Sequence, residues 1–292
     1  MQKILVLGSR GQLGRDMTDL ATASGNDVVE LDFPEIDITD PDAVNKIVAL
    51  HAPQTIINCC AYTAVDACES HERDAFAVNS DGIAAIAEAA RKTGSLVVHF
   101  STDYVYDGLK NSPYIETDAP NPKSVYGKSK LAGDRRLERT LPNHIILKVS
   151  WLYGIHGKHF IGKIRDLALK IKDSGQALKV VTDEIGTPTY TIDVCRQTLK
   201  LIDTSYRGTF HCTNEGYCSR YEFAREILST YAIDVPLMPC TSHDFVLPAP
   251  RPAYSVLENA RLKELGLNIM RDWKVAFREY VQEDKNKKQT TS

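Results

Sequence analysis

The stretch KILVLGSRGQLG, residues 3–14, decides the fold. It begins with a short apolar run that is typical of a buried strand. Gly8, Gly11 and Gly14 then form a GxxGxxG turn before a segment with apolar residues at helical spacing. Glycines permit a tight turn and a close approach of the backbone to a pyrophosphate, and a helix N-terminus favours an anion. The stretch therefore predicts a dinucleotide-binding strand–helix unit.

The same rhythm of apolar and amphipathic segments continues through the first half of the chain. It predicts strands at 27–32, 55–61, 96–102 and 144–151, and helices at 41–50 and 75–94. Strict alternation of strands and helices is typical of a parallel sheet that is covered on both faces. We therefore expect an α/β fold, with a Rossmann-like doubly wound parallel sheet and a smaller α/β substrate domain.

The regular alternation of predicted strands and helices ends near residue 150, and this change predicts the domain organisation. We expect residues 1–150 to form the dinucleotide-binding domain and residues 151–285 to form mainly the substrate-binding domain. No tether separates the two halves, and a later strand near 208–214 is expected to return to the first sheet, so the domains are interleaved. Residues 286–292 are polar and are predicted to form a flexible tail.

Composition excludes several classes of function. The formal net charge is −3, which provides no overall basic field for nucleic acid or an acidic membrane surface. No apolar run approaches the ~20 residues of a membrane helix, and no signal peptide is evident, so we expect a cytoplasmic protein. The seven cysteines contain no CxxC pair, which predicts free thiols and no zinc site.

Two residues near the glycine turn bear on the choice of cofactor. Asp32 ends the second predicted strand, where a carboxylate would bind the adenosine ribose hydroxyls and favour NADH. Arg10 lies within the turn, where a guanidinium could accept the 2′-phosphate of NADPH. The two residues favour different cofactors, and we predict NADH with NADPH tolerated.

A second group of polar residues follows the predicted strand 96–102. Ligands of a parallel sheet bind beyond the carboxyl ends of its strands, so Ser101, Thr102, Asp103 and Tyr104 are expected to face the cleft. The stretch YGKSK, residues 126–130, puts a phenol and an ammonium four residues apart. On a helix these side chains lie on one face, where they can act on one small molecule.

The chain resembles the extended short-chain dehydrogenase/reductase family and, within it, the reductases that form dTDP-L-rhamnose. The motifs that carry the resemblance span residues 8–257: GSRGQLG, LDFPEIDITDPDAV, NCCAYTAVDACES, STDYVYDG, ETDAPNPKSVYGKSKLAGD, SWLYG, GTPTY and RPAYSVL. The resemblance implies reduction of the C4 ketone of dTDP-4-dehydro-L-rhamnose by hydride transfer from NADH or NADPH.

The resemblance also implies roles for individual residues. Tyr126 would donate the proton, Lys130 would bind the nicotinamide ribose and lower the pKa of Tyr126, and Thr102 would hold the carbonyl oxygen. The implied cofactor contacts are Gly8, Arg10, Gly11, Gln12, Leu13, Gly14, Asp32, Asp37, Ile38, Ala61, Tyr62, Thr63, Tyr126 and Lys130. The implied substrate contacts are Thr102, Asp103, Tyr104, Trp151 and Arg251.

The sequence departs from the family pattern at two positions in the substrate half. His159 stands where an asparagine is expected, and Glu184 stands where the pattern has DQ. Both departures leave the predicted redox centre intact, but they bear on how the substrate is held.

Other functions stay open at this point. One is a different nucleotide-sugar epimerase or reductase, and another is a regulatory subunit of the methionine adenosyltransferase type, which would not need the redox residues. The presence of Thr102, Tyr126 and Lys130 favours an enzyme. The sequence allows a monomer or a homodimer, and it leaves open whether Asp16 meets a metal ion at a subunit contact.

Overall fold

A six-stranded parallel sheet forms the centre of the larger part of the molecule. The computed structural model describes residues 1–290, the last three as backbone only. The strands are β1 (Lys3–Leu7), β2 (Asp27–Leu31), β3 (Thr55–Asn58), β4 (Leu96–Thr102), β5 (His144–Val149) and β10 (Gly208–His211). Their order is β10-β5-β4-β3-β1-β2, and every neighbouring pair is parallel. The prediction of a doubly wound α/β fold is therefore confirmed.

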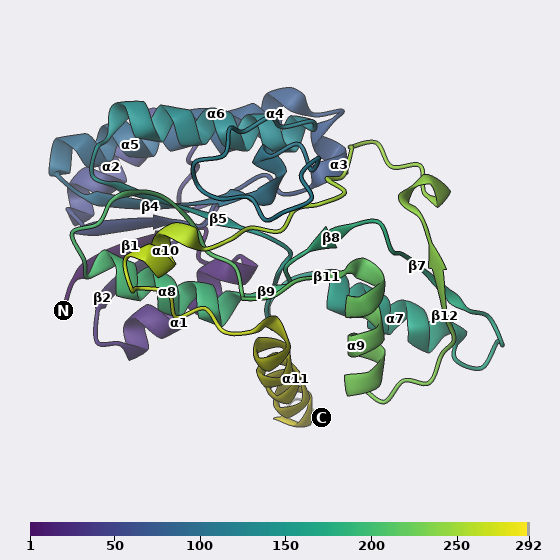
Figure 1. The fold of residues 1–292 in the computed structure, drawn as a ribbon. Coiled ribbons are helices and arrows are strands. Elements are labelled where there is room, and N and C mark those ends of the chain that lie inside the picture. Colours follow the sequence, from purple (N-terminus) through teal and green to yellow (C-terminus); the bar gives the residue numbers. More distant parts are fainter. Residues whose placement is uncertain (291–292) are drawn as a thin grey trace.

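Helices cover both faces of this sheet, as Figure 1 shows. On one face lie α2 (Pro41–His51), α5 (Gly82–Thr93) and α6 (Val125–Thr140); on the other lie α1 (Gln12–Ala23), α8 (Thr191–Ile202) and α10 (Ala260–Glu264). Asp40 caps α2 by accepting the N–H groups of Asp42 and Ala43, as its place before Pro41 predicts.

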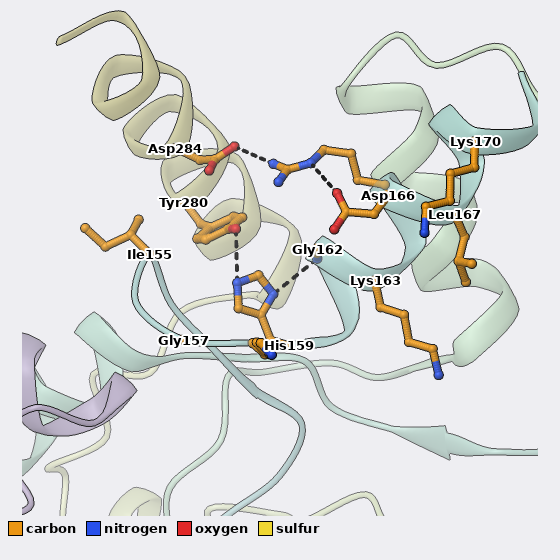
Figure 2. Close-up of a pocket in the computed structure, with 12 residues that line it drawn as sticks. Ile155, Gly157, His159, Gly162, Lys163, Asp166, Leu167, Lys170, Tyr280 and Asp284 are labelled. Carbon is orange, nitrogen blue, oxygen red and sulfur yellow. Dashed lines mark hydrogen bonds and ion pairs between the residues drawn. The ribbon is translucent and has the colours of Figure 1, made fainter. Parts of the chain in front are cut away.

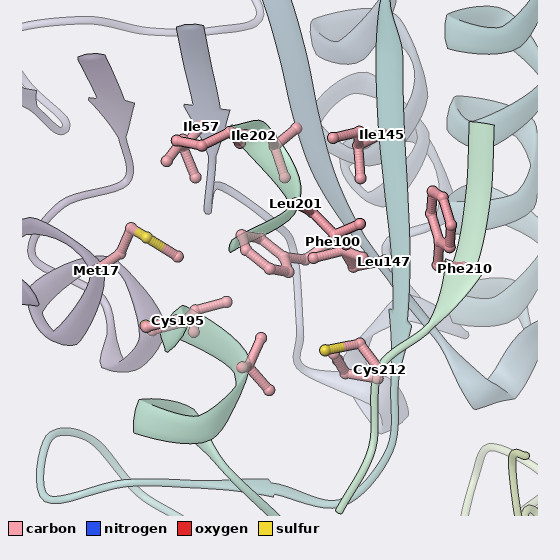
Figure 3. Close-up of a cluster of buried hydrophobic side chains, with 14 of the residues drawn as sticks. Met17, Ile57, Phe100, Ile145, Leu147, Cys195, Leu201, Ile202, Phe210 and Cys212 are labelled. Carbon is pink, nitrogen blue, oxygen red and sulfur yellow. The ribbon is translucent and has the colours of Figure 1, made fainter. Parts of the chain in front are cut away.

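Each face of the sheet has its own apolar core. Figure 3 shows the cluster beneath α1 and α8, where Met17 and Cys195 pack against strand residues such as Ile57 and Leu147. All four side chains are fully buried. The helix α8 belongs to this core, although the sequence pattern did not predict it as a helix.

A smaller α/β unit lies at one end of the sheet and has a separate core. Its long elements are α7 (Phe160–Ile171), α9 (Arg220–Thr230) and α11 (Trp273–Thr290). Its strands are β6 (Leu152–Tyr153), β7 (Leu178–Val181), β8 (Ile185–Gly186), β9 (Thr189–Tyr190), β11 (Cys218–Ser219) and β12 (Leu237–Cys240), and they pair two by two. Aromatic residues dominate the core, among them Tyr153, Phe223 and Phe277.

Two segments differ from the expected secondary structure. The helix expected over 75–94 is divided into α4 (Glu72–Phe76), a π-helical turn over Ala77–Asp81, and α5. The polar tail expected from residue 286 continues α11 as helix to Thr290, which corrects that prediction because α11 is anchored by buried residues such as Phe277. The rest of the predicted tail, 291–292, lies outside the described residues.

The remaining short elements follow β4 or β12, or lie in the loop after β3. They are α3 (Val65–Cys68) and the 3₁₀ turns Asp103–Val105 and Ser242–Asp244. Among residues 1–290, no helix combines the length and the apolarity needed to cross a membrane.

Candidate active site

The glycine turn follows β1. The order of the strands reverses at this strand, because β2 lies on one side of β1 and β3 lies on the other. Gly8 has a φ of +76°, and a Cβ there would lie 2.8 Å from the backbone nitrogen of Cys60. A Cβ on Gly14 would lie 2.0 Å from the carbonyl oxygen of Gly8. No side chain caps the N-terminus of α1. The turn therefore presents bare backbone and an uncapped helix end, which suits a pyrophosphate.

A trough of about 320 Å³ opens beside this turn. Six of the predicted cofactor residues line it: Gly8, Gly11, Asp32, Asp37, Ile38 and Ala61. The trough is also lined by Phe33, Ile36, Cys59, Cys60 and Val78, which were not predicted as cofactor contacts. Gln12, Leu13, Tyr62 and Thr63 do not line the trough, and the Leu13 side chain packs into the core beneath α1.

The π-helical turn explains how the loop after β3 is held. Its Asn79 is fully buried and accepts the N–H of Tyr62 at 2.8 Å. The Asn79 amide also donates to the Tyr62 carbonyl oxygen and to the Ser129 hydroxyl on α6. One side chain thus joins the predicted cofactor loop to the helix that carries Tyr126. The alternation pattern gave no signal for this role.

The side chains of Asp32 and Arg10 both form hydrogen bonds with other groups of the protein. The Asp32 carboxylate accepts the backbone N–H groups of Arg10 and Phe33, each at 2.7 Å. The Arg10 guanidinium donates to the Phe33 carbonyl oxygen and forms an ion pair with Glu35. A hollow of about 370 Å³ beside them is lined by both acidic and basic side chains, including Arg15 and Glu30. The site therefore retains features that suit either cofactor.

Thr102 and Tyr126 meet at the carboxyl edge of the sheet. Thr102 is the last residue of β4, and Tyr126 lies in the first turn of α6. The Thr102 hydroxyl lies beside the Tyr126 phenol and acts to lower its pKa, and the rings of Tyr126 and Tyr104 pack edge to face at a centroid distance of 5.5 Å. Burial raises the pKa of Tyr126, so the phenol holds its proton at neutral pH.

Lys130 lies one turn along α6 from Tyr126, but its amine points beneath the sheet edge. The side chain is 1 % exposed, and its Nζ donates to the Phe100 carbonyl oxygen at 2.6 Å. It also lies 3.2 Å from Nε2 of His99. A solvated surface pair of tyrosine and lysine is therefore excluded. Burial has the largest effect on the pKa of Tyr126, and the expected lowering of that pKa by Lys130 stays a prediction.

Asp103 is directed inward and not into the cleft. It is 2 % exposed, and its carboxylate accepts hydrogen bonds from the hydroxyls of Thr102 at 3.0 Å and Ser150 at 2.9 Å. Burial raises its pKa. In this structure Asp103 orients Thr102, and its expected contact with the substrate stays a prediction.

A second hollow, of about 350 Å³, lies on the side of the smaller unit and includes Arg251. Lys163, Arg220 and Arg251 provide basic groups there, and Phe160 and Phe245 provide apolar surface. Arg251 also lines a small hollow with Tyr104, which links this side to the predicted catalytic edge. Such a combination suits a nucleotide, with cations for its phosphates and rings for its base.

Trp151 does not line that hollow, and the contact with the substrate expected for it stays a prediction. The guanidinium of Arg220 lies 3.5 Å from its ring centroid and covers one face. Gly186 is so close to the ring that a Cβ would lie 2.4 Å from Cε2. Arg220 therefore reaches the hollow, supported by Trp151 and by an ion pair with Glu184. Arg220 was not predicted as a site residue, because a single arginine in a helix belongs to no motif.

Figure 2 shows a further hollow, of about 680 Å³, beside the start of α7. Arg165 there pairs with Asp284 and Asp166, and His159 caps α7 by accepting the N–H of Gly162. None of the predicted catalytic or cofactor residues lines it. The departure at His159 therefore has a structural role as a helix cap.

No metal centre is evident in the part of the chain that the structure describes. Within residues 1–290, no three His, Cys, Asp or Glu side chains are grouped as a metal site. Asp16 is buried and accepts a hydrogen bond from the Thr191 hydroxyl. Burial raises the pKa of Asp16 to about 6.

Comparison with known proteins agrees with this geometry. The family model described as "RmlD substrate binding domain" matches residues 1–286. The chain belongs to the RmlD family. A similar protein is the dTDP-4-dehydrorhamnose reductase of Mycolicibacterium smegmatis, which is 36 % identical over 284 residues, or 96 % of this chain and 85 % of that protein.

Two solved structures of dTDP-4-dehydrorhamnose reductases have the same fold. The Clostridium acetobutylicum protein superposes with a TM-score of 0.93 at 42 % identity, and the match covers 96 % of this chain and 98 % of that one. The Bacillus anthracis protein, solved in complex with NADP, has a TM-score of 0.91 at 33 % identity, with 97 % and 98 % covered. The RmlD fold therefore extends over nearly the whole chain.

Proposed function

We propose that this protein reduces the C4 ketone of dTDP-4-dehydro-L-rhamnose to the alcohol of dTDP-L-rhamnose, with a reduced nicotinamide dinucleotide as hydride donor. One observation carries the proposal: the hydroxyl of Thr102 lies beside the phenol of Tyr126 at the carboxyl edge of the sheet, with the Tyr104 ring against Tyr126. The names of relatives within the RmlD family support the same reaction.

The protein's own residues account for the proton. As the hydride reaches C4, negative charge develops on the ketone oxygen, and a neutral phenol can donate a proton to it. Tyr126 is neutral at pH 7 because burial raises its pKa. Thr102, oriented by Asp103, would hold the same oxygen. Lys130 would bind the cofactor ribose, and its positive charge would favour the phenolate that remains.

The dinucleotide would lie along the trough beside the glycine turn. Its pyrophosphate would meet Gly11 and the start of α1, and its adenosine would lie against Asp37 and Ile38. We propose that both NADH and NADPH are accepted. The choice between them depends on Asp32 and on how readily Arg10 leaves Glu35. A relative solved with NADP supports use of the phosphorylated cofactor.

The nucleotide part of the substrate would occupy the hollow near α7 and α9. Arg251 and Arg220 are placed to bind its diphosphate, and Phe160 and Phe245 to contact its base. We further propose a cytoplasmic location, where sugar nucleotides are made. A monomer or a homodimer stays the prediction for the oligomeric state. A metal ion at Asp16 stays an open alternative.

A coupled assay tests the function directly. The protein is incubated with dTDP-glucose and the upstream dehydratase and epimerase, which generate the unstable ketone in place. Absorbance at the nicotinamide band is followed separately with NADH and NADPH, and the product is identified by mass spectrometry. We expect cofactor oxidation together with formation of dTDP-L-rhamnose. No oxidation of either cofactor, with both upstream enzymes active, would overturn the proposal.

A further inference from the structure

An exposed aromatic ring lies at the rim of the trough beside the glycine turn. Phe33 lines this trough and is 70 % exposed. Ile36 and Ile38, which also line it, are at most 5 % exposed and belong to the core beneath α2 and α5. Single exposed apolar side chains are common on protein surfaces, so the surroundings of Phe33 decide whether the ring has a function.

The backbone of Phe33 is fixed on both sides of the ring. Its N–H donates to Oδ1 of Asp32 at 2.7 Å, and its carbonyl oxygen accepts the Arg10 guanidinium at 3.0 Å. The Ile36 N–H donates to the Asp32 carbonyl oxygen at 3.1 Å and closes the turn after β2. A ring carried by such a turn loses little backbone freedom when a ligand covers it.

The strand order places the adenosine end of a dinucleotide at this turn. Along the carboxyl edge of the sheet the strands follow one another as β4, β3, β1 and β2. The reacting nicotinamide must lie near Thr102 at the end of β4, and the pyrophosphate near Gly11 after β1. Neighbouring strands are about 4.8 Å apart, so the dinucleotide continues past β1 in the same direction. Its adenine therefore reaches the end of β2, where Phe33 lies.

We propose that the Phe33 ring covers one face of the cofactor's adenine, which makes Phe33 a binding residue for the adenosine half of the dinucleotide. The inference rests on the proposed function, because it requires a dinucleotide in this trough. Adenine presents a flat aromatic face, and stacking on an aromatic side chain is a common way to hold a base. Asp32 in the same turn is placed to meet the ribose, so one short turn binds both the base and its sugar.

This contact should serve NADH and NADPH equally. The ring lies against the base, which the two cofactors share, whereas the 2′-phosphate by which they differ is expected near Arg10. Loss of the Phe33 ring should therefore weaken the binding of both cofactors by the same factor and leave the ratio of their dissociation constants unchanged.

The first test measures the affinity of the protein for adenosine 2′,5′-diphosphate, which contains the adenine half of NADPH and no nicotinamide. Isothermal titration calorimetry is used for this ligand and for both cofactors. Phe33→Ala should raise all three dissociation constants roughly tenfold. Phe33→Trp, which keeps an aromatic face, should bind at least as tightly as the wild type. Values within twofold of the wild type in Phe33→Ala, or equally weak binding in Phe33→Trp, would overturn the proposal.

A matched control separates the ring contact from a general loss of exposed apolar surface. Leu50, near the end of α2, is 71 % exposed and lines none of the hollows described above. Leu50→Ala should bind all three ligands as the wild type does. Because both side chains are exposed, both alanine variants should unfold at the wild-type temperature. An equal loss of affinity in Leu50→Ala and Phe33→Ala would overturn the proposal.

A second test uses the wild-type protein and observes the contact directly. The phenylalanine rings are labelled with ¹³C, and the Phe33 signals are assigned by their loss in Phe33→Leu. With bound NADP⁺ we expect nuclear Overhauser effects between the adenine protons H2 or H8 and the Phe33 ring. Bound NADP⁺ without such effects would overturn this inference alone. A wild-type protein that binds no dinucleotide would overturn the proposed function as well.

Discussion

The hydroxyl group of Thr102 lies beside the phenol of Tyr126, although one residue ends a strand and the other begins a helix after a long loop. The two groups are neighbours because the first turn of α6 packs on the 3₁₀ turn that follows β4. Gly127 makes this contact possible, since a Cβ there would lie 2.2 Å from the Tyr104 carbonyl oxygen. The hydroxyl oxygens of Thr102 and Tyr126 are thereby placed next to each other at the carboxyl edge of the sheet.

We predict that Tyr126→Phe lowers turnover by a factor on the order of 10² or more. The change removes the proton donor and keeps the ring that contacts Tyr104. Cofactor affinity, measured by NADPH fluorescence, should stay within about twofold because no phosphate contact is lost. Full turnover in this variant would exclude Tyr126 from the chemistry.

Substitution of Gly14 should affect both stability and cofactor binding. A Cβ in Gly14→Ala would lie 2.0 Å from the Gly8 carbonyl oxygen, so α1 must move away from the turn. We expect a loss of about 1–3 kcal/mol of unfolding free energy and weaker NADPH binding. The matched control is Gly162→Ala, at the same third position of α7, where the nearest atom lies 3.9 Å away. That control should bind NADPH normally.

Two opposite substitutions test the cofactor preference. Arg10→Ala should weaken NADPH binding by roughly tenfold, because a charge-assisted contact to the 2′-phosphate is lost, and should change NADH binding little. Glu35→Gln releases Arg10 from its ion pair and should strengthen NADPH binding. The measurement is the ratio of the two dissociation constants. Equal changes for both cofactors would show that Arg10 does not contact the 2′-phosphate.

Arg251 should affect the sugar nucleotide and not the dinucleotide. In Arg251→Gln we expect KM for the substrate to rise roughly 10- to 100-fold through the lost phosphate contact, with NADPH affinity unchanged. Asp66→Asn removes the partner of Arg251 but keeps its charge, so KM should change less. The coupled assay at varied substrate gives both values. A larger rise in Asp66→Asn than in Arg251→Gln would contradict this assignment.

The buried His211 should make stability depend on pH. Burial lowers its pKa to about 3, whereas the unfolded chain takes up a proton near pH 6.5. Its contribution is therefore complete above pH 6.5 and is lost as the pH falls toward 3. Relative to wild type, His211→Gln should flatten the acid slope of the unfolding free energy by up to about 1.4 kcal/mol per pH unit. Denaturant titrations of both proteins at pH 7, 6 and 5 measure the unfolding free energy. The same dependence on pH in wild type and His211→Gln would contradict the prediction.

The sequence by itself determined the parts of this protein that depend on local pattern. The glycine spacing of residues 8–14, the cap at Asp40 and the pairing of Tyr126 with Lys130 on one helix face all follow from rules that act within a few residues. Alternation of strands and helices was enough for the doubly wound sheet. The local pattern also predicted Gly8, Gly11 and Asp32 beside the cofactor, whereas Asp37, Ile38 and Ala61 in the same trough were expected from the family resemblance.

Only the tertiary structure decided which distant side chains meet. Arg220 joins the nucleotide hollow because α9 packs in the smaller unit. Asn79 reaches Tyr62 because a π-helical turn displaces it from the regular helix. Asp103 turns inward to Thr102 and Ser150, and Lys130 is held by Phe100 and His99. These contacts depend on packing between elements far apart in the chain, and local periodicity carries no information about the direction of a single side chain after that packing.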